Sequence, residues 1–200
     1  MANSYYPKEL DELISTLKEL PGIGQRGAER MAFCMLKWPE DKLNFLGEKI
    51  SSLQEKIKKC IVCGNLCEKD LCSICSNPGR DISVICILED YTQIPPIEKS
   101  GFKGIYHILG GKLSPLENKG VETLSLEPLL SRINSDKPAE IILALSQDVE
   151  GQATTIYIAG LLKDKNIKIT TLARGIPAGA DISYANSATI AAAIDGRVLI

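Results

Sequence analysis

The first third of the chain carries apolar residues at helical spacing. Three such runs begin near residues 8, 26 and 39, and a Pro-Gly pair separates the first two. The pattern predicts helices joined by short turns, and no strand, over residues 8–59. The apolar positions that carry it are Leu10, Leu13, Ile14, Leu17, Leu20, Ala28, Met31, Ala32, Met35, Leu43, Leu46, Ile50, Leu53 and Ile57.

From residue 81 onward the pattern changes to short apolar runs that are rich in β-branched residues. Each run predicts a strand, and helical stretches lie between the runs. Near-continuous apolar strands that alternate with helices predict a mainly parallel sheet with helices on both faces. The expected strands are 82–88, 104–109, 140–145 and 167–172, and the expected helices are Gln93–Lys99, Leu126–Ile133, Gln152–Leu162 and Ser187–Ile194.

Five cysteines lie in a short polar segment between these two regions. Cys60-x-x-Cys63 and Cys72-x-x-Cys75 have the spacing of a tetrahedral zinc site with four thiolate ligands. Cys67 falls at no matching spacing, although it could compete as a ligand. Four cysteines leave no open coordination position, so the zinc is expected to be structural and not catalytic. A redox-active or incidental cluster is the alternative interpretation.

The remaining cysteines and the change of pattern suggest how the chain is divided. The seven cysteines are odd in number and clustered, which favours metal binding in a reducing cytosol over a disulfide framework. Cys34 and Cys86 lie in apolar stretches and are expected to be buried. We therefore predict a helical domain over 1–59, a zinc finger over 60–80 and an α/β domain over 81–200.

The stretch "LPGIGQRGAER" contains Gly22-x-Gly24-x-x-Gly27, which formally matches a dinucleotide-binding fingerprint. That fingerprint must follow a strand, whereas an amphipathic helix precedes it here. The stretch instead predicts a helix, a hairpin turn and a second helix, whose first amides would face a DNA phosphate. Arg26 and Arg30 lie one helical turn apart and would add charge to the same contact. An ordinary turn between packed helices is the alternative.

Acidic residues follow the expected strands of the α/β region. Glu89 and Asp90 follow the first strand, and Asp148 and Glu150 follow the third. Because the carboxyl ends of parallel strands meet at one edge, these four acids form a predicted acidic rim that Arg174, after the fourth strand, would join. The acids are candidate Mg²⁺ ligands, or they only help to start the next helix. His107, the one histidine, is expected to be structural.

Composition narrows the function classes. The chain has 200 residues, 44% of them hydrophobic and 24% charged, which is typical of globular proteins. Neither a signal peptide nor an apolar run of membrane-spanning length is visible, so we expect a cytoplasmic protein without a membrane partner. The net charge of −2 argues against a generally basic surface. DNA binding would need a local patch or several copies of the chain.

Five segments together resemble the RecR family of bacterial recombination mediators, and the resemblance runs from about residue 10 to the carboxyl terminus. They are, in order, "LPGIGQRGAERMAF", "CIVCGNLCEKDLCSIC", "ICILEDYTQIPPIEKSGFKGIYHILGGKLSPLE", "VEGQATTIYIAGLL" and "LARGIPAGADISYA". The resemblance implies an amino-terminal helix-hairpin-helix domain, a four-cysteine zinc finger and a carboxyl-terminal Toprim domain. In Toprim enzymes an acid after the first strand and an acidic pair after a later strand bind Mg²⁺, and Glu89, Asp148 and Glu150 match these positions.

The resemblance also implies a function. Members of the family are not known for catalysis; they form tetrameric ring clamps on DNA and, with RecO or RecF, help to load RecA onto single-stranded DNA coated by SSB. Arg26 and Arg30 would face the DNA, and the acids would meet partner proteins, in a cytoplasmic, nucleoid-associated protein. The chain departs from the family's pattern at Ser183 and Asn186, where acids are usual. A Mg²⁺-dependent Toprim nuclease or a primase-like enzyme is the alternative, and a zinc scaffold without DNA affinity is a third.

Overall fold

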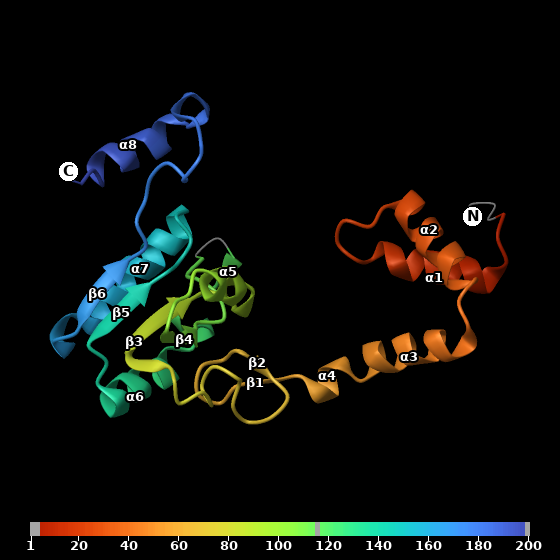
Figure 1. Ribbon diagram of the computed structural model, residues 1–200, viewed down its shortest axis with the longest axis horizontal. Coiled ribbons are helices and arrows are strands. Elements are labelled where there is room, and N and C mark those ends of the chain that lie inside the picture. Colours follow the sequence, from red (N-terminus) through yellow and green to blue (C-terminus); the bar gives the residue numbers. More distant parts are fainter. Residues whose placement is uncertain (1–4, 115–116, 199–200) are drawn as a thin grey trace. The chain divides into compact units, whose positions relative to one another are not determined.

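The computed structural model describes residues 5–114 and 117–198. The chain divides after Lys56 into two compact units (Figure 1). Within the described residues, the first unit contains the helices α1 to α4, and the second contains the strands β1 to β6 and the helices α5 to α8. Within the described part of the chain, every helix is too short or too polar to span a membrane.

Two helices, α1 (Lys8–Lys18) and α2 (Gln25–Met35), form the packed part of the first unit. Their contact buries Ile14 of α1 against Ala28 and Ala32 of α2. The two alanines lie one turn apart on one side of α2, and their small side chains allow the helix backbones to approach closely. The helical periodicity predicted both helices. On α2, the buried residues are the two alanines, the smallest of the apolar residues that formed the pattern.

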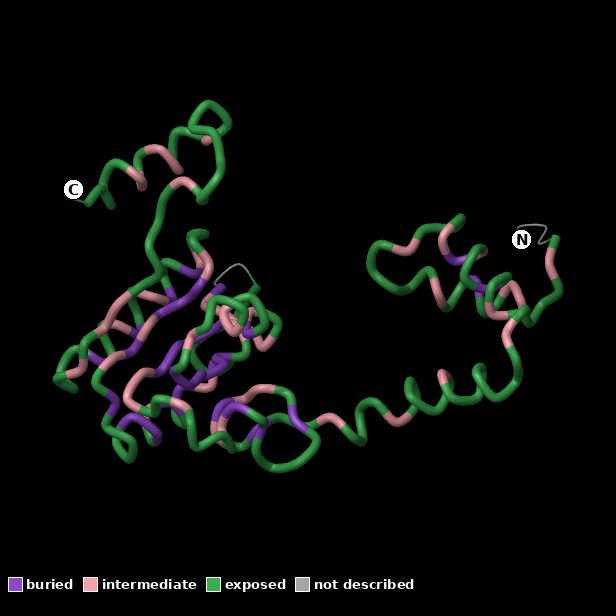
Figure 2. The backbone as a smooth tube through the Cα atoms, viewed as in Figure 1, coloured by how far each residue is buried: buried purple, intermediate pink, exposed green. Residues whose placement is uncertain are grey.

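The helices α3 (Glu40–Ser51) and α4 (Leu53–Lys56) also form where the periodicity predicted them, but neither has a buried residue (Figure 2). Ile50 and Leu53 are 66% and 58% exposed. Apolar side chains of α1, α2 and α3 line a groove of about 580 Å³. The apolar side of α3 therefore lacks a covering element within the described part of its own unit.

Two expectations about this part of the chain are wrong. Cys34 is exposed, because it lies on the side of α2 opposite Ala28 and Ala32. Residues 58–59, expected to be helical, form the short strand β1 (Lys58–Lys59), which pairs antiparallel with β2 (Leu66–Cys67). This pairing closes residues 60–65, which include Cys60 and Cys63, into a loop. Cys86, by contrast, is buried as predicted.

The second unit is built on a four-stranded parallel sheet in the order β4-β3-β5-β6 (Figure 1). The β-branched runs seen in the sequence supply the strands, because such side chains pack well on a pleated surface. The strands are β3 (Asp81–Leu88), β4 (Gly104–Ile108), β5 (Glu140–Leu143) and β6 (Lys168–Thr171).

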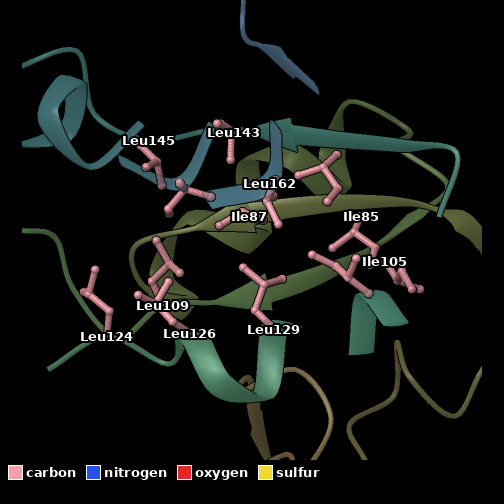
Figure 3. Close-up of a cluster of buried hydrophobic side chains, with 13 residues drawn as sticks. Ile85, Ile87, Ile105, Leu109, Leu124, Leu126, Leu129, Leu143, Leu145 and Leu162 are labelled. Atoms are coloured by element: carbon pink, nitrogen blue, oxygen red, sulfur yellow. The ribbon is translucent and has the colours of Figure 1, made fainter. Parts of the chain in front are cut away.

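The two faces of the sheet bury alternate residues of its central strand β3. Ile85 and Ile87 point to one face, which α6 (Leu126–Asp136) and α7 (Val149–Leu162) cover (Figure 3). Cys86 and Leu88 point to the other, which α5 (Ile94–Lys99) and the cysteine segment cover. Helices thus lie on both faces, as predicted. The described residues also form α8 (Ser187–Asp195), which has no buried residue, and 3-10 turns at Tyr91–Gln93, Val121–Thr123, Lys163–Lys165 and Ile182–Tyr184.

His107 has a structural position near the carboxyl end of β4. Its side chain is buried, and its Nε2 atom lies 2.8 Å from the carbonyl oxygen of Ser125. Burial lowers the pKa of this imidazole to about 4, so the ring is neutral near pH 7. The expectation that this histidine supports the fold agrees with these surroundings.

Candidate functional site

The four thiols of the two Cys-x-x-Cys pairs converge on one point. The sulfur atoms of Cys60, Cys63, Cys72 and Cys75 all lie within 4.8 Å of one another, and those of Cys63 and Cys72 are 3.6 Å apart. Zn–S bonds of about 2.3 Å in a tetrahedron place sulfur atoms about 3.8 Å apart. The arrangement therefore fits a zinc ion bound by these four residues.

The electrostatics of the cluster also favour a bound cation. Burial alone raises the pKa of Cys60, but backbone hydrogen bonds to its sulfur from Cys72, Cys63 and Val62 lower it to about 7. A hydrogen bond in which the Cys63 thiol donates to the Cys75 side chain raises the pKa of Cys63 well above its ordinary value, and burial raises it further. Thiolates packed this closely repel one another, and a divalent metal removes that repulsion by coordinating them.

A glycine turn and a backbone hydrogen bond hold the thiol cluster against the sheet. Gly64 adopts a left-handed φ of 77° directly after Cys63, and an added Cβ would lie 3.2 Å from Cβ of Ile108. The amide of Ile108 in β4 donates a 2.8 Å hydrogen bond to the carbonyl of Cys63. A side chain at position 64 would thus be strained and crowded. Both the turn after Cys63 and the packing of the cysteine segment on β4 therefore depend on glycine.

Cys67 lies outside the thiol cluster. Its sulfur donates to the carbonyl oxygen of Lys69 at 2.8 Å, and the carbonyl of Lys58 is 3.6 Å away. Burial raises the pKa of this thiol. The geometry leaves Cys67 as a buried neutral thiol beside the site rather than a fifth candidate ligand.

The turn between α1 and α2 has the features expected of a phosphate contact. Gly22 adopts a left-handed φ of 80°, and Gly24 is the N-cap of α2 without a capping side chain. The first turn of α2 contains no acid. Arg26 and Arg30 are exposed, and among the described residues no hydrogen bond or ion pair engages either guanidinium. The helix N-terminus and two uncommitted cations thus belong to one short segment.

Glu89 lies at the carboxyl end of β3 and faces the end of β5. Its carboxylate accepts hydrogen bonds from the backbone amide and the hydroxyl of Ser146, at 2.6 and 2.9 Å. These two bonds join the loops that follow two neighbouring strands. The residue therefore holds the edge of the sheet together.

Asp148 and Glu150, at the start of α7, meet a lysine that the sequence did not single out. The ammonium of Lys112 contacts the Asp148 carboxylate and lies 3.4 Å from an oxygen of Glu150. Asp148 also caps α7 by accepting a 2.8 Å hydrogen bond from the Gly151 amide, and Ser114 donates to Glu150. The hydrogen bond that Lys112 donates to Asp148 is the main reason why the pKa of Lys112 is raised. The same bond lowers the pKa of Asp148.

These acids do not form a metal-binding cluster. Among the described residues, three or more cysteine, histidine or acidic ligand atoms gather within 4.8 Å only at the four cysteines. Glu89 is engaged by Ser146, and the pair on α7 is engaged by Lys112. In this arrangement the three carboxylates are engaged by protein groups, whereas Mg²⁺ would need free oxygen ligands at about 2.1 Å.

Asp90 lies at the acidic rim as predicted, whereas Arg174 makes no described contact with the acids there. Asp90 is the N-cap of the 3-10 turn at Tyr91–Gln93, where its side chain accepts a 2.9 Å bond from the Thr92 amide. Arg174 is exposed, and within the described residues no hydrogen bond or ion pair joins its side chain to the acids. The pocket at the acidic rim is lined by Glu89, Asp90, Gly110, Gly111, Lys112, Ser114, Glu117, Lys119 and Glu150.

Sequence reasoning missed Lys112, Ser114 and Ser146. All three follow the carboxyl ends of strands, and this position in the sequence could have marked them as candidate residues of the rim. The loop after β4 borders the rim because β4 pairs directly with β3. That neighbour relation is not visible in a single sequence.

Gly151 sets the approach of α7 to the rim, and replacing it tests this packing. An added Cβ would lie well inside contact distance of the Ser146 carbonyl. We expect Gly151→Ala to cost about 1–3 kcal/mol of unfolding free energy, measured by chemical denaturation. Gly160→Ala in the same helix meets nothing within 4 Å and should be neutral or stabilising. Equal stability of the two variants would contradict the packing described here.

The fold and the site define a class: a protein with a helix-hairpin-helix, a four-cysteine zinc centre and a Toprim-type sheet. Family models match these parts in the same order. The RecR helix-hairpin-helix model matches residues 10–53, and the RecR four-cysteine zinc finger model matches 57–77. The Toprim domain model matches 83–173, and the RecR carboxyl-terminal model matches 175–198.

Curated relatives are similar over nearly the whole chain. Recombination protein RecR of Bifidobacterium longum subsp. infantis is 42% identical over 193 residues, which cover 96% of each chain. The protein of the same name from Moorella thermoacetica is 42% identical over 194 residues, 96% of this chain and 98% of the relative. The chain belongs to the RecR family of recombination proteins.

Proposed function

We propose that the chain is a non-catalytic mediator of recombinational repair that forms a clamp on DNA. With RecO and RecF, the clamp promotes loading of RecA onto single-stranded DNA coated by SSB. The observation that carries the proposal is the hairpin turn, where Arg26 and Arg30 are exposed beside the N-terminus of α2. Amides and arginines of this kind bind phosphates without reading the base sequence, which suits a protein that acts wherever a gap occurs.

Self-assembly is part of the proposal, and a second copy of this chain is the partner we assign to the apolar side of α3. That helix has no buried residue in its own unit although Leu43 and Ile50 are apolar. The adjoining groove is lined almost entirely by apolar side chains, and α8 in the other unit has no buried residue either. Two such faces per chain allow a closed ring, for which we propose a homotetramer.

Assembly of several copies would also explain how a chain with almost no net charge in its helical domain binds DNA. Residues 1–59 contain ten Lys or Arg and nine Asp or Glu, so one copy offers DNA almost no net charge. A ring that points Arg26 and Arg30 of each copy inward sums weak contacts through effective concentration. DNA binding and assembly are therefore expected to fail together.

The acidic rim is proposed as the surface that meets a basic partner protein. The pocket there is lined by the four acids Glu89, Asp90, Glu117 and Glu150 and by two lysines, so the surface remains acidic even with its internal ion pairs. A basic surface of RecO or RecF would complement it. The proposal places the protein in the cytoplasm, at the nucleoid, where these partners and the DNA are found.

A single assay separates this function from a Mg²⁺-dependent nuclease or a primase-like enzyme. Purified protein is incubated with labelled gapped DNA, nucleotides and Mg²⁺, and both binding and covalent change of the DNA are followed. We expect binding with the DNA chemically unchanged, for the wild type and for Glu89→Ala alike. Nicking or synthesis that Glu89→Ala abolishes would overturn the proposal and establish an active Toprim site.

A further inference from the structure

We infer that Lys112 is the resident cation of the acidic rim: its ammonium group, held between Asp148 and Glu150, takes the place that a Toprim enzyme would give to Mg²⁺. The rim is thereby completed by the chain itself and excludes a divalent metal. The inference deepens the proposed function, on which it rests for the partner-facing role of the rim, and it concerns what occupies the rim before any partner arrives.

The contacts of Lys112 are those of a cation bound by two carboxylates. Its Nζ atom forms ion pairs with both acids of the pair that matches the Toprim metal ligands. The Lys112 side chain is only 25% exposed, that of Glu150 is 32% exposed and that of Asp148 is 51% exposed. The partly buried pair with Glu150 is screened less by salt than a pair on an open surface.

The loop that carries Lys112 is anchored directly after it, so the ammonium is positioned in advance. Gly110 and Gly111 turn the chain out of β4 with φ values of 85° and 155°. The amide of Leu113 then donates a 2.9 Å hydrogen bond to the hydroxyl of the buried Thr154 in α7. Ser114, the following residue, donates to Glu150. Two consecutive residues thus fasten the loop to the helix that presents the acids.

The third acid of the expected metal set is also committed within the chain. Glu89 accepts two hydrogen bonds from Ser146, and its charge is among the causes that keep Lys112 protonated. A Mg²⁺ ion would have to displace an anchored ammonium and also turn Glu89 away from Ser146. Magnesium is reluctant to lose its waters even at favourable sites, so this displacement is unfavourable.

The experiment compares metal binding by full-length, zinc-loaded variants in the absence of DNA and partner proteins. The probe is Mn²⁺, a substitute for Mg²⁺ whose free concentration is read directly by electron paramagnetic resonance, with Mg²⁺ as competitor. Lys112→Ala removes the cation and leaves space, whereas Lys112→Arg keeps a cation. Lys119→Ala makes the same charge change in the same loop, at a lysine that pairs with Glu117 instead.

We expect Lys112→Ala to gain one saturable Mn²⁺ site per chain, at least about tenfold tighter than any in the wild type, because a positive charge beside two carboxylates has been removed. Lys112→Arg and Lys119→Ala should bind like the wild type. Adding Glu150→Gln to Lys112→Ala should abolish the gain. Mg²⁺ should raise the Tm of Lys112→Ala and leave that of the wild type unchanged, since a ligand stabilises only the protein that binds it.

Three results would overturn the inference. Wild-type protein that binds one Mn²⁺ per chain as tightly as Lys112→Ala would show that the lysine excludes nothing. A Lys112→Ala protein without a gain would show that the acids are not held back by this cation. A similar gain in Lys119→Ala would reduce the effect to general surface charge. None of these results depends on DNA or partner binding, so the proposed function and this inference can fail separately.

Discussion

Replacement of Cys60 by serine is expected to lower zinc content and thermal stability together. Structural zinc contributes about 10–16 kcal/mol of apparent binding free energy in zinc-finger peptides, so one of four ligands is worth roughly 3 kcal/mol, or about a hundredfold in affinity. The cysteine segment covers one face of the parallel sheet. Loss of the metal should therefore destabilise the second unit and not only the finger. Metal analysis and a thermal melt of the same sample measure both effects.

Cys67→Ser is the matched control for this change. Cys67 is buried in the same segment, but its sulfur contacts the carbonyl of Lys69 and not the other thiols. We expect it to keep one zinc per chain. If Cys60→Ser instead retains a full equivalent of zinc, Cys67 has entered the coordination shell, and the assignment of the outer four cysteines fails.

The double variant Arg26→Ala, Arg30→Ala is expected to weaken DNA binding strongly while leaving zinc content and Tm unchanged. Neither arginine has a hydrogen-bond or ion-pair partner among the described residues, so the fold loses nothing with them. Each phosphate contact that is lost should reduce the slope of log K against log salt by about 0.7 for single strands and about 0.9 for duplex DNA. Because every copy in an assembly carries both changes, the reductions add across the ring.

Titration of labelled DNA at several salt concentrations measures this effect. The control is Lys8→Ala with Lys37→Ala, which removes two exposed cations of the same unit that lie outside the hairpin turn. That pair should change affinity and slope only slightly. Unchanged affinity in the arginine variant would contradict the assignment of the hairpin turn as the DNA contact.

Much of the fold could be predicted from local sequence patterns. The helical spacing around Ile14 and Ala28, the β-branched run at 82–88 and the two Cys-x-x-Cys pairs each report a local preference that the tertiary structure kept. The local pattern did not predict burial correctly where burial depends on which element packs against the residue. Cys34 sits in an apolar stretch and is exposed, and Ile50 has ideal periodicity yet is 66% exposed.

For the acidic rim, too, the sequence predicted the location of the residues but not their contacts. Position after a parallel strand was enough to bring Glu89, Asp148 and Glu150 to one edge. It could not show that Asp90 caps a 3-10 turn, or that no hydrogen bond or ion pair joins the Arg174 side chain to these acids within the described residues. Those outcomes follow from loop conformations, which depend on hydrogen bonds between segments far apart in the chain.

By itself, the sequence determined the order of the three parts, the four candidate zinc ligands and the exposed arginines of the hairpin, because periodicity and ligand spacing are local properties. Only the tertiary structure decided the occupant of the acidic rim. Lys112 is 36 residues from Asp148 along the chain, and the two meet because β4 and β5 both pair with β3. A contact of this kind arises from strand order, and strand order is a property of the whole sheet rather than of any one segment.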